Sequence, residues 1–213
     1  ADLGKAYVEL FRKLGGEVLV ADARTLEADG AGWQVQGADG PISGREAVIA
    51  LGIWSRDVMA KLGAPVLLRA KRGYHMHYSS KGNATLSRPV LDADAGYVLA
   101  PMHQGIRLTT GVEFARTNAP PSTRQIDLAE PVARQLYPLN ERIEDTPWLG
   151  RRPCFPDMLP AIGHIPGHPG LWANFGHQHL GFTLGPVTGR LLAEALTGEA
   201  PFTDMAPYNV HRF

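Results

Sequence analysis

The sequence predicts an α/β (α+β) protein in which a mostly antiparallel β region interrupts two α/β regions. Three observations predict this class. Apolar residues recur with a helical period near both ends of the chain, short alternating runs fill residues 65–149, and a glycine-rich turn separates a strand from a helix near the C-terminus. The 213 residues suffice for one large domain or two small ones.

The first region reads as helix, strand and small β-meander. Residues 3–14 carry apolar side chains at helical spacing, which predicts an amphipathic helix that ends at Gly15. Residues 17–20 predict a strand, and the runs at 25–28, 33–36 and 47–51 predict further strands separated by glycine-containing turns. This order suits an α/β nucleotide-binding domain with an inserted meander.

The middle and final regions contain further predicted strands and helices. Strand-like runs at 66–68, 74–78, 85–88, 97–101 and 106–110 predict a mostly antiparallel sheet. A helix is predicted at residues 126–136, with Ser122 or Thr123 as its cap. After Gly150, a strand at 171–174 and a helix from about residue 182 to 196 complete the chain, and that helix should bury Val187, Leu191, Leu192 and Ala195.

Composition excludes several classes of function. Lys plus Arg and Asp plus Glu both number 21, so the chain has no basic field for nucleic acid or anionic lipid. The single cysteine, Cys154, excludes an intramolecular disulfide and is expected to pack in the core. The N-terminus lacks a signal-peptide pattern and an initiator Met. We expect a cut into a longer chain, with a processed mature N-terminus as the alternative.

Two segments carry possible chemistry. Residues 176–186 form a glycine-rich strand-to-helix turn, in which the backbone can approach a ligand and the helix start favours negative charge, such as that of a reduced flavin. A plain connection is the alternative. Arg151 and Arg152 follow Gly150, and a guanidinium is the natural partner of a substrate carboxylate. A salt bridge at the surface or between domains is the alternative.

Four stretches, in this order, resemble the flavin oxidoreductase family of D-amino-acid dehydrogenase, glycine oxidase and sarcosine oxidase. They are residues 50–55, 71–74, 150–163 and 176–189, and residues 110–114 add weaker support. The resemblance implies FAD as cofactor and a Rossmann-like FAD-binding domain made of residues 1–60 and 150–213. It also implies that residues 61–149 form an antiparallel substrate-binding domain.

The resemblance also implies an activity. The expected reaction oxidises the Cα–N bond of a D-amino acid, glycine or an N-methyl amino acid by hydride transfer to flavin N5, without a catalytic side-chain base. The electron acceptor, oxygen or a quinone-linked chain, is left open, and a homo-oligomer is allowed. A cytoplasmic or membrane-peripheral location fits the family best.

Site residues follow from the same resemblance. Arg152 matches the carboxylate-binding arginine of the family. Tyr74 and Tyr97 are candidates to contact substrate, with sheet packing as the alternative for both. The predicted flavin contacts are Gly52, Trp54, Gly176, His177, Leu180, Gly181, Phe182 and Thr183.

One family feature is missing. The family begins with a strand, a GxGxxG turn and a helix that grip the dinucleotide, and no GxGxxG occurs in these residues. We therefore expect activity only together with a preceding segment. The alternative is a non-catalytic binding or assembly subunit, or a fragment that has lost flavin binding.

The histidines do not predict a metal site, and two of the tryptophans are expected to be structural. His75 and His77 should share one face of a strand, and His177 and His179 flank Gln178 in the glycine-rich turn. No four-ligand cluster is spaced as structural zinc requires, so no metal site is predicted. Trp33 and Trp148 are expected to be structural.

Overall fold

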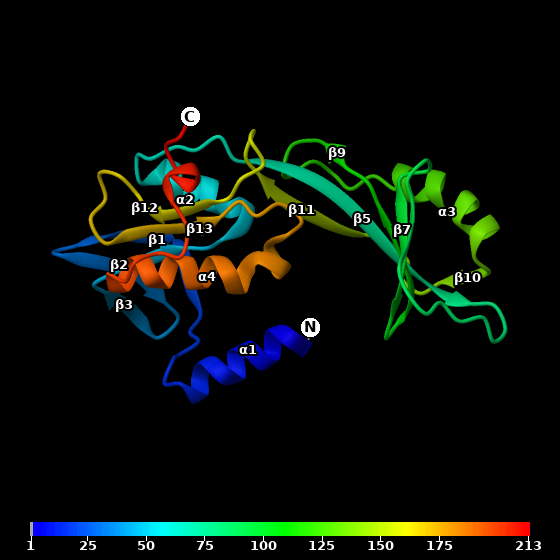
Figure 1. Cartoon of the computed structure of the whole chain (residues 1–213), viewed down its shortest axis with the longest axis horizontal. Helices are drawn as coiled ribbons and strands as arrows, with labels where there is room; N and C mark the ends of the chain where they lie inside the picture. The colour runs from blue at the N-terminus through cyan, green and yellow to red at the C-terminus, as the bar shows by residue number, and fades with distance from the viewer. Residues whose placement is uncertain (1) are drawn as a thin grey trace. The chain divides into compact units, whose positions relative to one another are not determined.

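The computed structural model describes residues 2–213, which divide into two compact units (Figure 1). Unit 1 comprises the residues up to 67 together with 161–175 and 187–213. Unit 2 comprises residues 68–160 and 176–186. Among residues 2–213, no helix combines the length and the apolar character that a membrane crossing would need.

Unit 1 contains two small sheets. The elements are α1 (Asp2–Lys13), β1 (Ala21–Asp29), β2 (Gly32–Gly37), β3 (Gly40–Gly44), β4 (Ala47–Ile49), η1 (Gly52–Trp54), α2 (Ser55–Lys61), β12 (Ala161–His164), β13 (Leu171–Phe175), the later turns of α4 (Gly181–Thr197) and η2 (Ala206–Tyr208). Strands β1, β2 and β3 form an antiparallel meander, in which β1 and β2 were predicted and β3 was not, because residues 38–41 were expected to form a turn. In the second sheet, β13 pairs antiparallel with β12 and parallel with β4.

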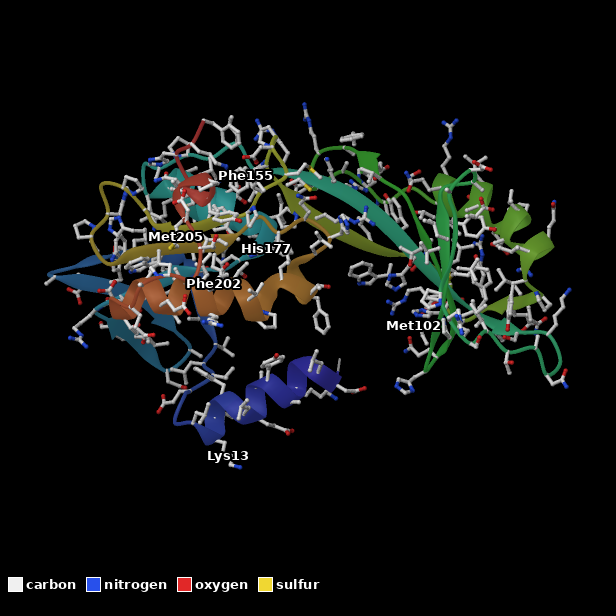
Figure 2. The ribbon with its side chains drawn as sticks, in the orientation of Figure 1. Lys13, Met102, Phe155, His177, Phe202 and Met205 are labelled. Atoms are coloured by element: carbon white, nitrogen blue, oxygen red, sulfur yellow. The ribbon has the colours of Figure 1, made fainter. Side chains whose placement is uncertain are left out.

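The core of unit 1 lies beside α4. Leu191 and Leu192 are buried against Ile162, and Met205 packs on the same cluster (Figure 2). The predicted buried face of this helix is thus confirmed for its centre. Val187 was wrongly placed on that face, because it is 42% exposed.

Three predicted strands are wrong. Residues 17–20, 66–68 and 85–88 have no strand pairing in the described chain. Val18, Leu19 and Val20 are between 48% and 79% exposed, and although the carbonyl oxygen of Val20 accepts a hydrogen bond from the N–H of Ala38 at 3.0 Å, little burial supports their β propensity. Residues 64–68 bury alternate side chains as a strand would, yet they form no ladder.

Unit 2 is built on one sheet of seven strands. Its elements are β5 (Arg69–Ser80), β6 (Val90–Asp92), β7 (Tyr97–Met102), β8 (Gly105–Thr110), β9 (Glu113–Phe114), α3 (Arg124–Leu136), β10 (Leu139–Arg142), β11 (Trp148–Cys154) and the first turns of α4. All strand pairs are antiparallel, as predicted, and the long β5 pairs with β8, β9, β10 and β11 (Figure 1). Strands β6, β9, β10 and β11 were not predicted.

The two faces of β5 differ because side chains alternate along a strand. Tyr74, Met76 and Tyr78 point into the core of unit 2, where they pack with Ile126 and neighbouring residues of α3. The intervening positions, which include Gly73, His75 and His77, therefore occupy the opposite face. That face carries the candidate site.

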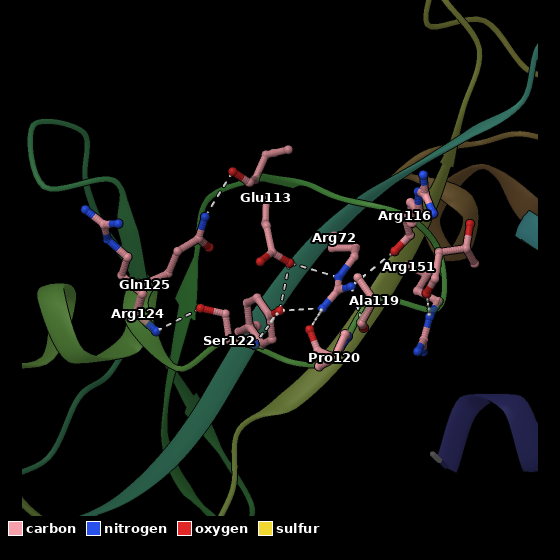
Figure 3. Close-up of polar contacts among 12 residues, drawn as sticks. Arg72, Glu113, Arg116, Ala119, Pro120, Ser122, Arg124, Gln125 and Arg151 are labelled. Atoms are coloured by element: carbon pink, nitrogen blue, oxygen red, sulfur yellow. Dashed lines mark hydrogen bonds and ion pairs between the residues drawn. The ribbon is translucent and has the colours of Figure 1, made fainter.

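A buried arginine ties the loop after β8 to β5. Arg72 is 0% exposed, and its Nε lies 2.8 Å from Glu113 Oε2 (Figure 3). Its Nη1 donates to the carbonyl oxygens of Arg116 and Ala119, and Nη2 donates to that of Pro120. A buried charge is tolerated only when it is paired and hydrogen-bonded, so these contacts hold residues 113–120 in one conformation.

The hydroxyl of Tyr74 completes this network. It accepts hydrogen bonds from Arg72 Nη2 at 2.8 Å and from the backbone N–H of Ser122 at 3.0 Å, and it donates to Glu113 Oε2 at 2.7 Å. Two stretches that are 41 positions apart in sequence, around Arg72 and around Glu113, thereby meet in one buried cluster.

Candidate functional site

A cavity of about 300 Å³ lies within unit 2. Strands β5, β8 and β11 and the turn that precedes α4 contribute to it. Its lining residues are Gly73, Tyr74, His75, Thr109, Trp148, Gly150, Arg151, Arg152, Gln178 and His179. The lining contains two arginines and no carboxylate, so the cavity favours an anion.

Two glycines make room on the floor of the cavity. Gly73 of β5 and Gly150 of β11 face each other across the strand pair. A Cβ on Gly73 would lie between 2.4 and 2.6 Å from three guanidinium atoms of Arg152, and one on Gly150 would lie 2.5 Å from the ring of Trp148. Since real Cβ atoms do not approach that closely, both long side chains lie where only glycine leaves space.

One nitrogen of the Arg152 guanidinium is hydrogen-bonded to the backbone, and its other N–H groups are available to an anion. It is half-buried, and its Nη1 donates to the carbonyl oxygen of Gly111 at 2.9 Å. Among residues 2–213, no carboxylate forms an ion pair with it. A guanidinium has five N–H donors in a fork that matches a carboxylate, so the other donors can receive a bound acid.

His75 and Trp148 form an aromatic wall beside this floor. Their rings stack with centroids 4.7 Å apart and planes at 20°. His77 meets His75 edge to face at 5.1 Å, which confirms that the two histidines share a face of β5. We expected Trp148 to be purely structural, but it is 60% exposed and lines the cavity. Trp33, in contrast, is 5% exposed and packs in unit 1 as expected.

His77 is fixed by charged partners on both ring nitrogens. Its Nδ1 lies 2.5 Å from Glu144 Oε1, and its Nε2 accepts a hydrogen bond from Arg107 Nε at 3.0 Å. The backbone N–H of His77 also donates to Glu144. Because Arg107 can only donate, the partners assign the proton of a neutral His77 to Nδ1.

His75 is neutral near pH 7. Burial, with smaller contributions from Arg107 and His77 and a smaller opposing effect of Glu144, lowers the pKa of its imidazole from 6.5 to about 4. The imidazole therefore keeps one donor and one acceptor nitrogen at neutral pH.

The two predicted tyrosines lie in different surroundings. Tyr74 lines the cavity, yet its hydroxyl belongs to the Arg72–Glu113 cluster. Tyr97 is 1% exposed within the core of unit 2 and is absent from the cavity lining, and burial raises the pKa of its phenol. The structure thus brings Tyr74, but not Tyr97, to the cavity of Arg152, and their substrate contacts stay predictions.

The glycine-rich turn adjoins β11. Cys154 forms an isolated bridge with His177, and the N–H of Gln178 donates to the carbonyl oxygen of Pro153 at 3.0 Å. Gly176 has φ +90°, and a Cβ there would lie 2.5 Å from the ring of Phe155, which neighbours this turn (Figure 2). Only glycine fits this position. Cys154 is buried, as expected, and burial raises the pKa of its thiol.

Among the predicted flavin contacts in this turn, most of the later residues are more exposed to solvent than His177. Burial lowers the pKa of His177, whereas Leu180 and Phe182 are 40% and 70% exposed and Thr183 is exposed. Helix α4 begins at Gly181. Among residues 2–213, no three His, Cys, Asp or Glu side chains are grouped as a metal ion would require.

The other two predicted flavin contacts belong to unit 1. Gly52 has φ +58° and opens η1, a conformation that favours glycine. Trp54 is 58% exposed at the end of the same turn. The hydroxyl of Ser55 accepts a hydrogen bond from the N–H of Leu51, which fixes the turn and gives Ser55 a structural role.

Replacing the floor glycine tests the placement of Arg152. Gly73→Ala should push the guanidinium aside and weaken acetate binding at least about tenfold, because one well-placed charged hydrogen bond contributes about 1.5–3 kcal/mol. Calorimetric titration of wild type and variant measures this. Gly189→Ala, where a Cβ meets nothing within 4 Å, is the control. Equal acetate affinity in wild type and Gly73→Ala would contradict the placement.

The depressed pKa of His75 predicts a pH effect on stability. The imidazole titrates near 6.5 when unfolded and near 4 when folded, so the unfolded state binds more protons between these values. Stability should therefore fall as pH decreases from 6.5 to 4, and less so in His75→Gln. Urea unfolding at pH 7 and pH 4.5 checks this, with each protein compared with itself at pH 7. An equal loss in both proteins would refute it.

Comparisons with known proteins agree with the sequence resemblance. Residues 1–195 match the family described as FAD dependent oxidoreductase (DAO). The D-amino-acid oxidase of Bradyrhizobium diazoefficiens is 30% identical over 214 residues, which cover 94% of this chain and 50% of the relative. The glycine oxidase of Pseudomonas putida is 31% identical over 176 residues, 82% of this chain and 47% of the relative. The chain thus spans about half the length of these relatives.

Solved structures give the same result. Glycine oxidase from Geobacillus kaustophilus superimposes with a TM-score of 0.73 at 25% identity, over 92% of this chain and 52% of that one. L-proline dehydrogenase from P. horikoshii reaches a TM-score of 0.78 at 18% identity, over 95% of this chain and 56% of that one, a likeness of fold alone. The chain belongs to the DAO family of FAD dependent oxidoreductases.

Proposed function

We propose that this chain is part of an FAD-dependent enzyme that oxidises the Cα–N bond of an amino acid or secondary amine. The proposed substrates are a D-amino acid, glycine or an N-methyl amino acid. Relatives named D-amino-acid oxidase and glycine oxidase support this class. Because the chain spans about half of each, the activity is proposed for the whole protein.

The observation that carries the proposal is the position of Arg152. Its guanidinium lies over Gly73 in a cavity without carboxylates and is anchored through one nitrogen to Gly111. A planar guanidinium with donors to spare binds a carboxylate in a defined orientation. Arg152 therefore holds the carboxylate of the substrate, and the cavity of about 300 Å³ accommodates a small amino acid.

The chain offers a partial fit for FAD. At Gly176 the backbone adopts a conformation that only glycine fits, and α4 then begins at Gly181, where the N-terminal end of a helix carries a partial positive charge. Such a helix start stabilises the negative charge of a reduced flavin ring. Residues 176–183 would hold one edge of the ring, with Gly52 and Trp54 as further contacts. Bound FAD supplies the acceptor for the hydride of the substrate Cα–H.

We propose that the remaining contacts to FAD come from residues outside this sequence. No GxGxxG turn occurs in the sequence, so the pyrophosphate and adenosine have no recognisable site here. In this assignment unit 2 carries most of the substrate site, and residues 1–60 and 150–213 contribute to the FAD-binding domain. Residues 61–149 are the proposed substrate-binding domain, although β11 joins its sheet.

Arg152→Lys in the flavin-loaded full-length protein tests the function. The variant keeps the charge but loses the fork, so KM for an amino-acid substrate should rise by the equivalent of about 2–5 kcal/mol. Steady-state kinetics measure this, and Arg124→Lys, an exposed residue of α3, is the control. An unchanged KM would reject the role of Arg152. A full-length protein that stays colourless after FAD reconstitution would favour a non-catalytic binding or assembly subunit.

A further inference from the structure

The imidazole of His75 is a polar group of the cavity that no neighbour uses. Among residues 2–213, it makes ring contacts with Trp148 and His77 but no hydrogen bond. It is half-buried and lines the cavity. Its ring nitrogens are not among the fully buried atoms that lack a partner in the described residues, so they are open to water or to a ligand.

The ring of His75 is held in place without a hydrogen bond of its own. Trp148 stacks on one side, and His77, itself fixed between Glu144 and Arg107, meets it edge to face. Binding a ligand therefore requires little ordering of this side chain, which favours affinity.

The spacing of His75 and Arg152 matches one small ligand. The guanidinium of Arg152 lies over Gly73, which is two residues from His75 on the same face of β5. Two residues of a strand span roughly 7 Å, a distance that an α-amino acid can bridge with one hydrogen bond at each end. If the carboxylate of such a ligand binds Arg152, its amino group lies beside the imidazole of His75.

The charges of the lining support the same pairing. An amino group donates hydrogen bonds, and the lining contains no carboxylate to receive them. The hydroxyl of Tyr74 is engaged with Arg72 and Glu113. The imidazole of His75 is an acceptor on the same strand face as the floor of the cavity.

We propose that His75 positions the substrate by accepting a hydrogen bond from its amino group while Arg152 holds its carboxylate. The inference rests on the proposed function and extends it, because it selects acids that carry an N–H on the adjacent carbon. Primary and secondary amino acids satisfy this requirement, and simple carboxylic acids do not.

A pair of matched ligands tests the proposal. D-alanine and propionate share a carboxylate and a carbon skeleton and differ in the amino group. Calorimetric titration of the flavin-free full-length protein measures both affinities without turnover. Wild type should bind D-alanine more tightly than propionate, and His75→Phe should lose about three- to tenfold of that preference, the worth of one hydrogen bond, with propionate affinity kept within about twofold.

Three variants make the outcome specific. His75→Phe keeps a ring against Trp148, and its retained propionate binding shows that the cavity is folded. His75→Gln restores an acceptor and should recover part of the preference for D-alanine. His103→Phe, in the exposed turn between β7 and β8, is the matched control and should behave as wild type.

The failures of the two proposals are distinguishable. If Arg152→Lys loses propionate binding while His75→Phe keeps the full preference for D-alanine, only the role of His75 is overturned. The same holds if wild type shows no preference for D-alanine. If wild type binds neither acid, or if Arg152→Lys binds propionate as wild type does, the carboxylate site and the role of His75 both fall.

Discussion

The buried ion pair of Arg72 and Glu113 is the constraint on which the candidate site depends. Arg72 has no exposure to water, so its charge must be satisfied by Glu113 and by the carbonyl oxygens of the following loop. Gly111, whose carbonyl oxygen accepts a hydrogen bond from Arg152, lies two residues before Glu113 in the chain. A charge hidden on one face of β5 therefore fixes the segment that orients the arginine on the other face.

Strand alternation separates these two tasks. On β5, the side chains of Arg72 and Tyr74 are buried in the interior of unit 2, whereas Gly73 and His75 lie on the opposite face, although Tyr74 also contributes to the lining of the cavity. The interior residues stabilise the fold through burial. On the cavity face, Gly73 leaves space that the side chain of Arg152 from β11 occupies. A register shift of one residue would exchange the faces, so the seven consecutive pairs between β5 and β11 protect both functions.

Periodic parts of the fold were predictable from the sequence, and contacts between distant residues were not. The helices at α1, α3 and α4 and the antiparallel middle region have clear apolar periods. Strand β11 was missed because Gly150 and Pro153 are poor strand formers in isolation, and pairing with β5 overrides that preference. Residues 17–20 show the converse, because their apolar side chains predict a strand, yet these residues form no ladder and Val18, Leu19 and Val20 are exposed.

The candidate site also has features that the sequence predicted and features that depend on contacts between distant residues. Arg152 was found from its motif, but its anchor on Gly111 and the glycine beneath it depend on strand pairing. His75 was placed on the right face by its spacing from His77, while its lowered pKa arises from burial and neighbouring charges that only the fold assembles. Trp148 gave no sequence signal of a cavity position.

The stability and acetate affinity of Glu113→Gln test this account most directly. The substitution leaves the Arg72 charge buried without its counter-charge, which should lower the free energy of unfolding by about 3 kcal/mol. It should also weaken acetate binding although Arg152 is unchanged, because the segment that contains Gly111 loses its anchor. Glu141→Gln, at an exposed position of β10, is the matched control. Wild-type stability together with wild-type acetate affinity in Glu113→Gln would contradict the account.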